Sequence, residues 1–189
     1  MEIKNPDIRH LNDMKKVVCD KEWLKKAQNY ELYYMYRGLK KEKGLRYNIT
    51  VIPVRMLGKE FVKTKGHDHK GNFKEIYTVL SGRAIYLLQK CKGKKVLDVF
   101  AVKAGKNESA LIPAGYGHIT INPGRKTLKE ADWARENCRN DYKFIEKMGG
   151  MCYYYTKSGW IKNENYESVP KLKFRKPLKG LPENLDFLK

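Results

Sequence analysis

Four side chains that commonly bind metal ions stand at spacings that could bring them to one point. His67 and His69 are two residues apart, which in a β-strand places both imidazoles on one face. Glu75 follows after a short glycine-containing loop that can return its carboxylate to the same place, and His118 opens a later β-rich run. Three imidazoles and one carboxylate suit Fe(II), Mn, Ni, Co or Zn and leave coordination positions open for substrate oxygens.

The segments that carry these ligands have the composition of short β-strands. β-rich runs separated by Gly, Pro and Asn recur at intervals of about ten residues, which is typical of an all-β sandwich or barrel. The dipeptide Ser81-Gly82 and the tripeptide 92–94 are predicted to be hairpin turns between successive runs. We expect strands over 30–37, 46–56, 60–64, 74–80, 83–89, 95–102, 109–112, 118–122 and 151–156.

Short helices are expected at two places beside this β-rich centre. Asp20 can cap a helix over about 20–28. A second short helix is expected around 141–148, because its apolar residues stop before two consecutive glycines. The preceding residues, from 127 onward, fit a helix or a strand equally, so both assignments stay open.

The chain has the size of one domain with a single core. Its 189 residues, 12% of them aromatic, suit one compact unit over 1–189. We expect an N-terminal helical or extended segment at 1–29, a barrel with its associated strands at 30–160, and a proline-containing C-terminal arm at 161–189. No linker composition divides the chain.

Composition also limits the classes of partner. No run of 18 apolar residues and no hydrophobic leader occur, so we expect a cytoplasmic protein with no membrane association. The scattered Cys19, Cys91, Cys138 and Cys152 fit reduced thiols better than a zinc knuckle or a disulfide framework. The net charge of +19 is spread along the chain, which favours a lysine-rich surface over a nucleic-acid-binding face.

The order of the metal-ligand residues resembles the two motifs of the cupin superfamily. His67-x-His69-x5-Glu75-x6-Gly82 is similar to the first motif, and Pro113-x-Gly115-x2-His118-x3-Asn122 is similar to the second. Cupins are double-stranded β-helix, or jelly-roll, barrels that hold a metal inside the barrel. The resemblance therefore implies a mainly β fold with a single cupin barrel.

Further segments narrow the resemblance to the archaeal cupin-type glucose-6-phosphate isomerases. They run in family order and are Arg9-His10-Leu11-Asn12-Asp13-Met14, Gly58-Lys59-Glu60-Phe61, Thr64-Lys65-Gly66-His67 and Asp141-Tyr142. The resemblance implies a metal-dependent enzyme of glycolysis and gluconeogenesis that interconverts glucose 6-phosphate and fructose 6-phosphate. It also implies a homodimer and one divalent metal ion per subunit, with Fe(II) favoured over Ni, Mn, Co or Zn.

Isomerisation moves hydrogen between C1 and C2, and the sequence offers groups for this task. A metal ion on the four ligands would act as a Lewis acid at the sugar oxygens. Glu75 is the candidate for moving a proton, and Tyr77 shares its strand face. A direct hydride shift would need no base, so both routes stay open. The resemblance points to Thr50, Thr64 and the backbone of Gly66 for phosphate, and to Tyr30 for sugar hydroxyls, which Tyr77 could also bind. Tyr142 resembles a further substrate-binding residue of the family.

Two positions depart from the family, and they keep further functions in view. Asn140 replaces a histidine, and Ala134 aligns with a tyrosine that helps at the phosphate, so isomerisation of a related sugar is one possibility. A cupin oxygenase or decarboxylase could use the same metal ligands. A non-enzymatic cupin that binds a sugar or nucleic acid would also agree with the two motifs and the positive charge.

Overall fold

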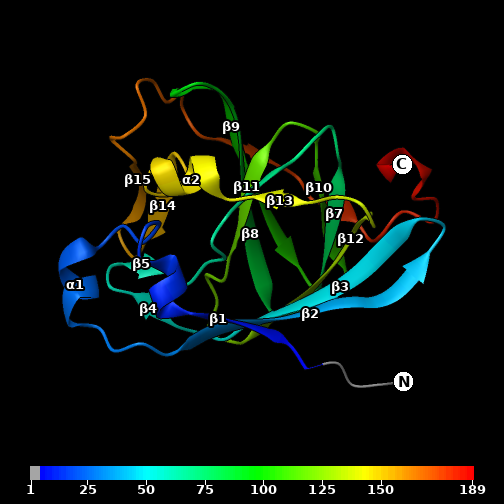
Figure 1. Ribbon diagram of the computed structural model, residues 1–189, viewed down its shortest axis with the longest axis horizontal. Coiled ribbons are helices and arrows are strands. Elements are labelled where there is room, and N and C mark those ends of the chain that lie inside the picture. The colour runs from blue at the N-terminus through cyan, green and yellow to red at the C-terminus, as the bar shows by residue number, and fades with distance from the viewer. Residues whose placement is uncertain (1–4) are drawn as a thin grey trace.

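The computed structural model describes residues 5–189, which build two main β-sheets around a common core (Figure 1). The larger sheet contains, in spatial order, β1 (Asp7–His10), β2 (Glu31–Glu42), β3 (Leu45–Ile52), β12 (Leu128–Arg135), β7 (Glu75–Ser81), β10 (Glu108–Ile112) and β17 (Leu178–Lys179). The smaller sheet contains β11 (Gly117–Ile121), β8 (Arg83–Lys92), β9 (Lys95–Gly105) and β16 (Lys173–Arg175). Neighbouring strands are antiparallel, except that β16 runs parallel to β9.

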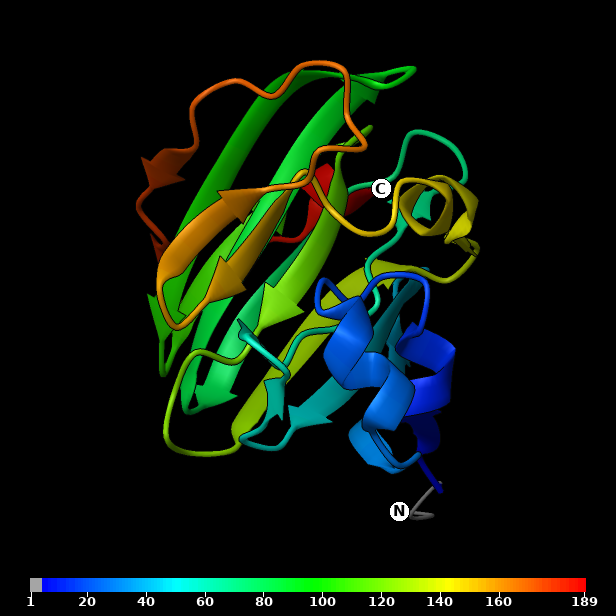
Figure 2. The same ribbon diagram turned by 90° about the vertical axis from the view of Figure 1, so that its left-hand side faces the viewer.

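Smaller elements surround the two main sheets. A two-stranded sheet pairs β6 (Asp68–His69) with β13 (Asn140–Asp141). A further sheet contains β15 (Gly159–Lys162), β14 (Tyr153–Thr156), β5 (Glu60–Phe61) and β4 (Met56–Leu57). The helices are η1 (Leu11–Met14), α1 (Lys21–Lys26), α2 (Lys143–Lys147) and η2 (Asp186–Leu188). Figure 2 shows η1, α1 and α2 on the same flank of the barrel.

The inner faces of the two main sheets share one hydrophobic cluster. Val79 and Ile112 from the larger sheet and Leu88 and Ile119 from the smaller sheet belong to it, each at most 1% exposed. Burying a side chain of this size stabilises the fold by roughly 1.5–3 kcal/mol. The prediction of a mainly β jelly-roll fold is confirmed.

The nine predicted strand segments all contain strands, with shifted ends. The helix predicted at 20–28 is α1, and the Asp20 side chain caps it by accepting a 3.0 Å hydrogen bond from the backbone N–H of Trp23. The helix predicted around 141–148 is α2, which ends before the positive-φ Gly149. The ambiguous stretch from 127 onward is largely β12, which lies between β3 and β7 in the centre of the larger sheet.

One of the two predicted hairpins is wrong. Residues 92–94 do form a hairpin turn, because Lys92 pairs with Lys95 across β8 and β9. Ser81-Gly82 instead carries the chain from β7 in one sheet to β8 in the other. Gly82 has φ +85°, and a Cβ there would lie 2.8 Å from the carbonyl oxygen of Thr127. The crossing therefore passes close to the backbone that leads into β12, which a hairpin pattern does not reveal.

The helices and the cysteines bear on membrane association and on disulfides. Within residues 5–189, every helix is too short or too polar to cross a membrane. All four cysteines are free thiols, as the sequence led us to expect.

The position of β12 sets the arrangement of the barrel wall. Cross-strand register aligns alternate residues of β3, β12 and β7 into three rows. Because side chains two residues apart share a face of a strand, these rows point into the same side of the sheet. The rows are Arg46–Ala134–Glu75, Asn48–Asp132–Tyr77 and Thr50–Glu130–Val79.

Candidate metal centre

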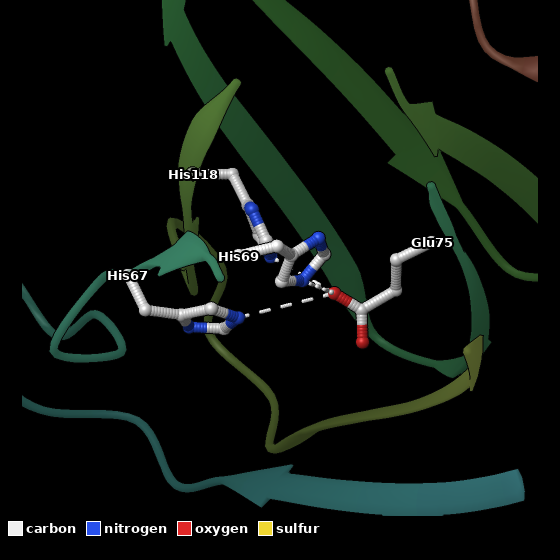
Figure 3. A group of neighbouring side chains, drawn as sticks. All are labelled: His67, His69, Glu75 and His118. Carbon is white, nitrogen blue, oxygen red and sulfur yellow. Dashed lines mark hydrogen bonds and ion pairs between the residues drawn. The ribbon is translucent and has the colours of Figure 1, made fainter. Parts of the chain in front are cut away.

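The four predicted ligands converge at one end of the barrel. Their ligand atoms all lie within 4.8 Å of one another. Oε2 of Glu75 lies 3.1 Å from Nε2 of His118, 3.2 Å from that of His69 and 3.9 Å from that of His67. Figure 3 shows this oxygen directed at the three imidazoles and the other carboxylate oxygen directed away from them.

Separate elements bring these ligands together. His69 ends β6, Glu75 begins β7, and His118 lies near the start of β11. His67 is held by two backbone hydrogen bonds with His118, of 3.0 and 3.2 Å. Gly66 precedes it with φ +84°, and a Cβ there would lie 2.5 Å from Cγ2 of Ile119. Only glycine therefore lets the chain approach β11 closely enough to place His67.

The surroundings of the rings suit metal coordination. Nδ1 of His69 lies 3.2 Å from the backbone carbonyl oxygen of Phe73. This contact favours the tautomer with the proton on Nδ1, which leaves the Nε2 lone pair for a metal. Nε2 of His67 is buried and has no hydrogen-bond partner among residues 5–189. Three imidazoles and a carboxylate at these separations fit a divalent metal ion.

Electrostatics favour the ligand forms of His67 and Glu75. Burial lowers the pKa of His67 well below its usual value, so this imidazole is neutral. Burial alone would raise the pKa of Glu75, but hydrogen bonds from His118 and His69 outweigh it and hold that pKa well below its usual value. A neutral imidazole and an ionised carboxylate are the states that bind a metal ion. Burial alone would lower the pKa of His69, but hydrogen bonds with Cys138 and Glu75 outweigh it and raise that pKa to about 10, so a metal ion would have to displace a proton from this ring.

An open cavity of about 560 Å³, counting its solvent-filled mouth, adjoins the cluster. His67 and Glu75 line it, so substrate in the cavity would reach the metal position. Most of the predicted substrate residues line it as well, namely Thr50, Thr64, Gly66, Tyr77 and Tyr142. Tyr77 is buried, and its hydroxyl lies 3.4 Å from Nε2 of His118. Burial raises the pKa of Tyr77 well above its usual value, so the hydroxyl stays protonated.

Tyr30 is the one predicted substrate-binding residue that does not line this cavity. Its ring packs under the guanidinium of Arg55, at 4.2 Å from the ring centroid. Tyr33, three residues on, lines the cavity instead, and its hydroxyl accepts a 3.1 Å hydrogen bond from the backbone N–H of Lys65. Tyr33 is thus the tyrosine from this part of the chain that lines the cavity.

Besides Tyr33, sequence reasoning missed five polar residues in the cavity wall. They are Arg37, Arg46, Asn48, Glu130 and Asp132. The alternation of Arg46, Asn48 and Thr50 along one strand was a usable signal. Glu130 and Asp132 also alternate, but the segment that carries them was equally compatible with a helix, so their common face could not be assigned.

Charge is unevenly distributed in the cavity. Its cations differ in exposure, because the side chain of Arg37 is 40% exposed and that of Lys65 is 14% exposed. The buried part carries Glu130 and Asp132, which are 1% and 5% exposed. Burial raises the pKa of Glu130 to about 8 and raises that of Asp132 well above its usual value.

The chain resembles known proteins over most of its length. It is 30% identical to a glucose-6-phosphate isomerase of Thermococcus litoralis over 149 residues, which are 75% of this chain and 76% of the relative. It is 28% identical to a glucose-6-phosphate isomerase of Pyrococcus horikoshii over 162 residues, which are 82% of this chain and 83% of the relative.

Solved structures include more distant matches. Oxalate decarboxylase from Bacillus subtilis, at pH 4.6, matches with 16% identity and a TM-score of 0.43, over 56% of this chain and 25% of that chain. The family model for glucose-6-phosphate isomerase (GPI) matches residues 8–171. This match spans most of the chain and includes all four candidate metal ligands. The protein thus belongs to the glucose-6-phosphate isomerase family.

Proposed function

We propose that this protein is a metal-dependent aldose–ketose isomerase that interconverts glucose 6-phosphate and fructose 6-phosphate. The observation that carries the proposal is the cluster of His67, His69, Glu75 and His118 beside a cavity with hydroxyl and cationic groups. When bound there, a divalent metal, with Fe(II) expected first and Ni, Mn, Co or Zn as substitutes, supplies a Lewis acid for the carbonyl and hydroxyl oxygens of C1 and C2.

Cationic and hydroxyl groups around the cavity suit the phosphate of the substrate. Arg46 donates from Nη1 to the carbonyl oxygen of Glu136 at 3.4 Å, and its buried Nε has no partner among residues 5–189. Lys65 lines the same cavity, next to Thr64 and the positive-φ Gly66. A guanidinium with a free N–H, an ammonium and a hydroxyl are strong donors to phosphate oxygens. Arg46 also faces Ala134 across β3 and β12, where the family places a tyrosine.

Glu75 and Tyr77 are the candidates for the chemical step. One oxygen of Glu75 faces the imidazoles, and the other points away from them, where it could take a proton from C2 and return it at C1 (Figure 3). Tyr77 lies two residues further along the same face and can donate its hydroxyl proton in a hydrogen bond to a sugar oxygen. Either residue would also serve a direct hydride shift, by holding the C1–C2 unit in place.

Tyr142 and Asn140 close another side of the cavity. Nδ2 of Asn140 lies 3.4 Å from the hydroxyl of Tyr142, and both residues line the cavity. Asn140 can donate to a sugar oxygen, but an amide carries no transferable proton near neutral pH. We therefore assign Asn140 and Tyr142 to binding, and the proton to Glu75.

A coupled assay on chelator-stripped protein tests this function. Adding back Fe(II), Ni, Mn, Co and Zn separately should restore conversion of glucose 6-phosphate to fructose 6-phosphate with at least one of them. His118→Ala should stay inactive with every metal, while His10→Ala, outside the cluster, should behave as the wild type. Lack of turnover with all five metals would show that the proposed function is wrong.

A further inference from the structure

Glu130 is a deeply buried acid that lies near the hydroxyls of Tyr86 and Thr120. Its side chain is 1% exposed, and neither carboxylate oxygen has a hydrogen-bond partner among residues 5–189. Leaving a buried polar group unpaired destabilises the folded state. Because Glu130 also lines the cavity, the missing partner is best supplied by a ligand.

Asp132 extends this acidic wall towards the metal centre. It lies two residues from Glu130 on the same face of β12, with its neighbour in register, Tyr77, on β7. Nδ2 of Asn48 donates a 2.6 Å hydrogen bond to Oδ2 of Asp132, which orients the carboxyl group at the cavity. The two acids therefore present several acceptor oxygens along one side of the space that reaches Glu75.

The ligand groups that suit this wall are hydroxyls rather than metal ions or phosphate. Among residues 5–189, Glu130 and Asp132 join no group of three or more potential metal ligands. A phosphate placed against them would meet carboxyl oxygens, which repel it whenever they ionise. The cations Arg37, Arg46 and Lys65 also line the cavity, and they come from β2, β3 and the loop before β6, not from β12. The phosphate therefore belongs with the cations, and the hydroxyls belong with the two acids.

Protonation adds to this fit. With its pKa raised to about 8 by burial, Glu130 is largely uncharged at neutral pH and can both accept from and donate to a hydroxyl group. The neighbouring hydroxyls of Tyr86 and Thr120 partly offset the effect of burial on this pKa, but neither completes a hydrogen bond with the carboxylate. A ligand with several hydroxyl groups suits this carboxyl group, because each hydroxyl can donate a hydrogen bond to it or accept one from it.

We propose that Glu130 and Asp132 form a hydroxyl-binding wall that selects polyhydroxylated phosphate esters by contacting the hydroxyls between the reacting carbons and the phosphate. The identity of the ester rests on the proposed isomerase function, whereas the wall itself can be tested by binding alone.

Calorimetric titration of the metal-loaded protein provides that test. The wild type should bind glucose 6-phosphate at least about 10-fold more tightly than hexyl phosphate, which keeps the phosphate and lacks the hydroxyls, because several hydroxyls would each gain a hydrogen bond in the cavity. Equal affinity for the two esters would overturn the proposal without any variant.

Substitutions in β12 then test whether Glu130 and Asp132 cause this difference in affinity. Glu130→Leu should weaken glucose 6-phosphate binding about 10-fold or more and leave inorganic phosphate binding within about twofold. Asp132→Asn and Glu130→Gln should give smaller losses of the same kind. Lys129→Leu, on the opposite, exposed face of β12, is the matched control and should bind as the wild type. If Glu130→Leu binds glucose 6-phosphate as tightly as the wild type, or loses both ligands equally, the wall does not select hydroxyls.

Turnover measured in parallel separates this inference from the proposed function. Normal isomerisation by the wild type, with unchanged sugar phosphate binding in the variants, refutes the wall and leaves the isomerase intact. Selective loss of sugar phosphate binding in the variants, with no isomerisation by the wild type under any metal, supports the wall and refutes the isomerase.

Discussion

Nδ1 of His69 and the carbonyl oxygen of Phe73 lie 3.2 Å apart. The loop before β7 thus holds a proton on Nδ1 and directs Nε2 of this candidate ligand at the cluster. The same loop delivers Glu75 to the cluster, so both groups depend on its conformation. The geometry of both candidate ligands thus depends on the backbone of this loop, which orients the ring of His69 and positions the carboxylate of Glu75.

Removing one imidazole should abolish tight metal binding. His67→Ala leaves two imidazoles and a carboxylate, and loss of one ligand from a set of four should lower affinity for the divalent ion by well over 10-fold. Metal content after dialysis and calorimetric titration measure the effect. His10→Ala is the control, and an equal loss in both variants would contradict the ligand assignment.

Gly66→Ala should disturb the same site through the backbone. A Cβ at this position combines φ +84° with a 2.5 Å contact to Ile119, so we expect a loss of about 2 kcal/mol or more in unfolding free energy and weakened metal binding. Gly44→Ala isolates the conformational strain, because its φ is +78° and nothing lies within 4 Å of the added methyl group. Urea unfolding of both proteins checks the difference, and similar losses would show that contact with Ile119 is unimportant.

Arg46→Met should affect substrate affinity more than the chemical step. If Arg46 binds the phosphate, its loss should raise KM about 10-fold or more and change kcat only slightly, because the phosphate is held equally in the ground and transition states. Steady-state kinetics with glucose 6-phosphate gives both constants. Lys40→Met is a control for the loss of one positive charge, because Lys40 pairs with Tyr47 and so lies on the opposite face of the same two strands. A fall in kcat at unchanged KM would place Arg46 elsewhere in the mechanism.

A buried ion pair beside the barrel should be important for stability. The side chains of Lys63 and Glu60 are 4% and 0% exposed and lie 2.7 Å apart. Lys63 also donates to the carbonyl oxygen of Val17, and Glu60 accepts from the backbone N–H of Cys19. Lys63→Met leaves Glu60 as an uncompensated buried charge and should cost about 3–5 kcal/mol in urea unfolding. Adding Glu60→Gln should recover part of that loss, and additive losses would refute the coupling.

The acid at position 130 should make stability depend on pH. Its folded-state pKa of about 8 lies above the ordinary 4.5, so the folded state holds this proton more tightly than the unfolded state. The contribution of Glu130 is therefore lost as pH rises from about 4.5 to about 8, by an amount on the order of a few kcal/mol. Glu130→Gln removes the titration, so its melting temperature relative to that of the wild type should rise steadily from pH 5 to pH 8. A constant difference across this range would contradict the shifted pKa.

The sequence was most informative where spacing and local chemistry coincide. His67 and His69 are two residues apart, and a short loop with a glycine leads to Glu75, so the relative positions of these three ligands depend on a few residues. His118 was identified because it stands where the second cupin motif has its histidine. Asp20 likewise revealed its helix, because a capping side chain acts within one turn.

Long-range pairing could not be predicted in the same way. Glu130 and Asp132 become cavity residues only because β12 inserts between β3 and β7, a pairing between segments about 80 and 50 residues away in the chain. The register of such strands depends on the whole sheet and not on local pattern. The predicted homodimer and the division into segments at 1–29, 30–160 and 161–189 stay predictions.

The C-terminal arm pairs with the two main sheets at once. Its β16 lies along β9 and its β17 along β10, so a few residues complete one margin of each sheet. During synthesis these margins stay open until residues 173–179 have left the ribosome, and unpaired backbone of this kind invites association between nascent chains. The order of synthesis thus leaves the almost complete barrel exposed to self-association until its last strands arrive.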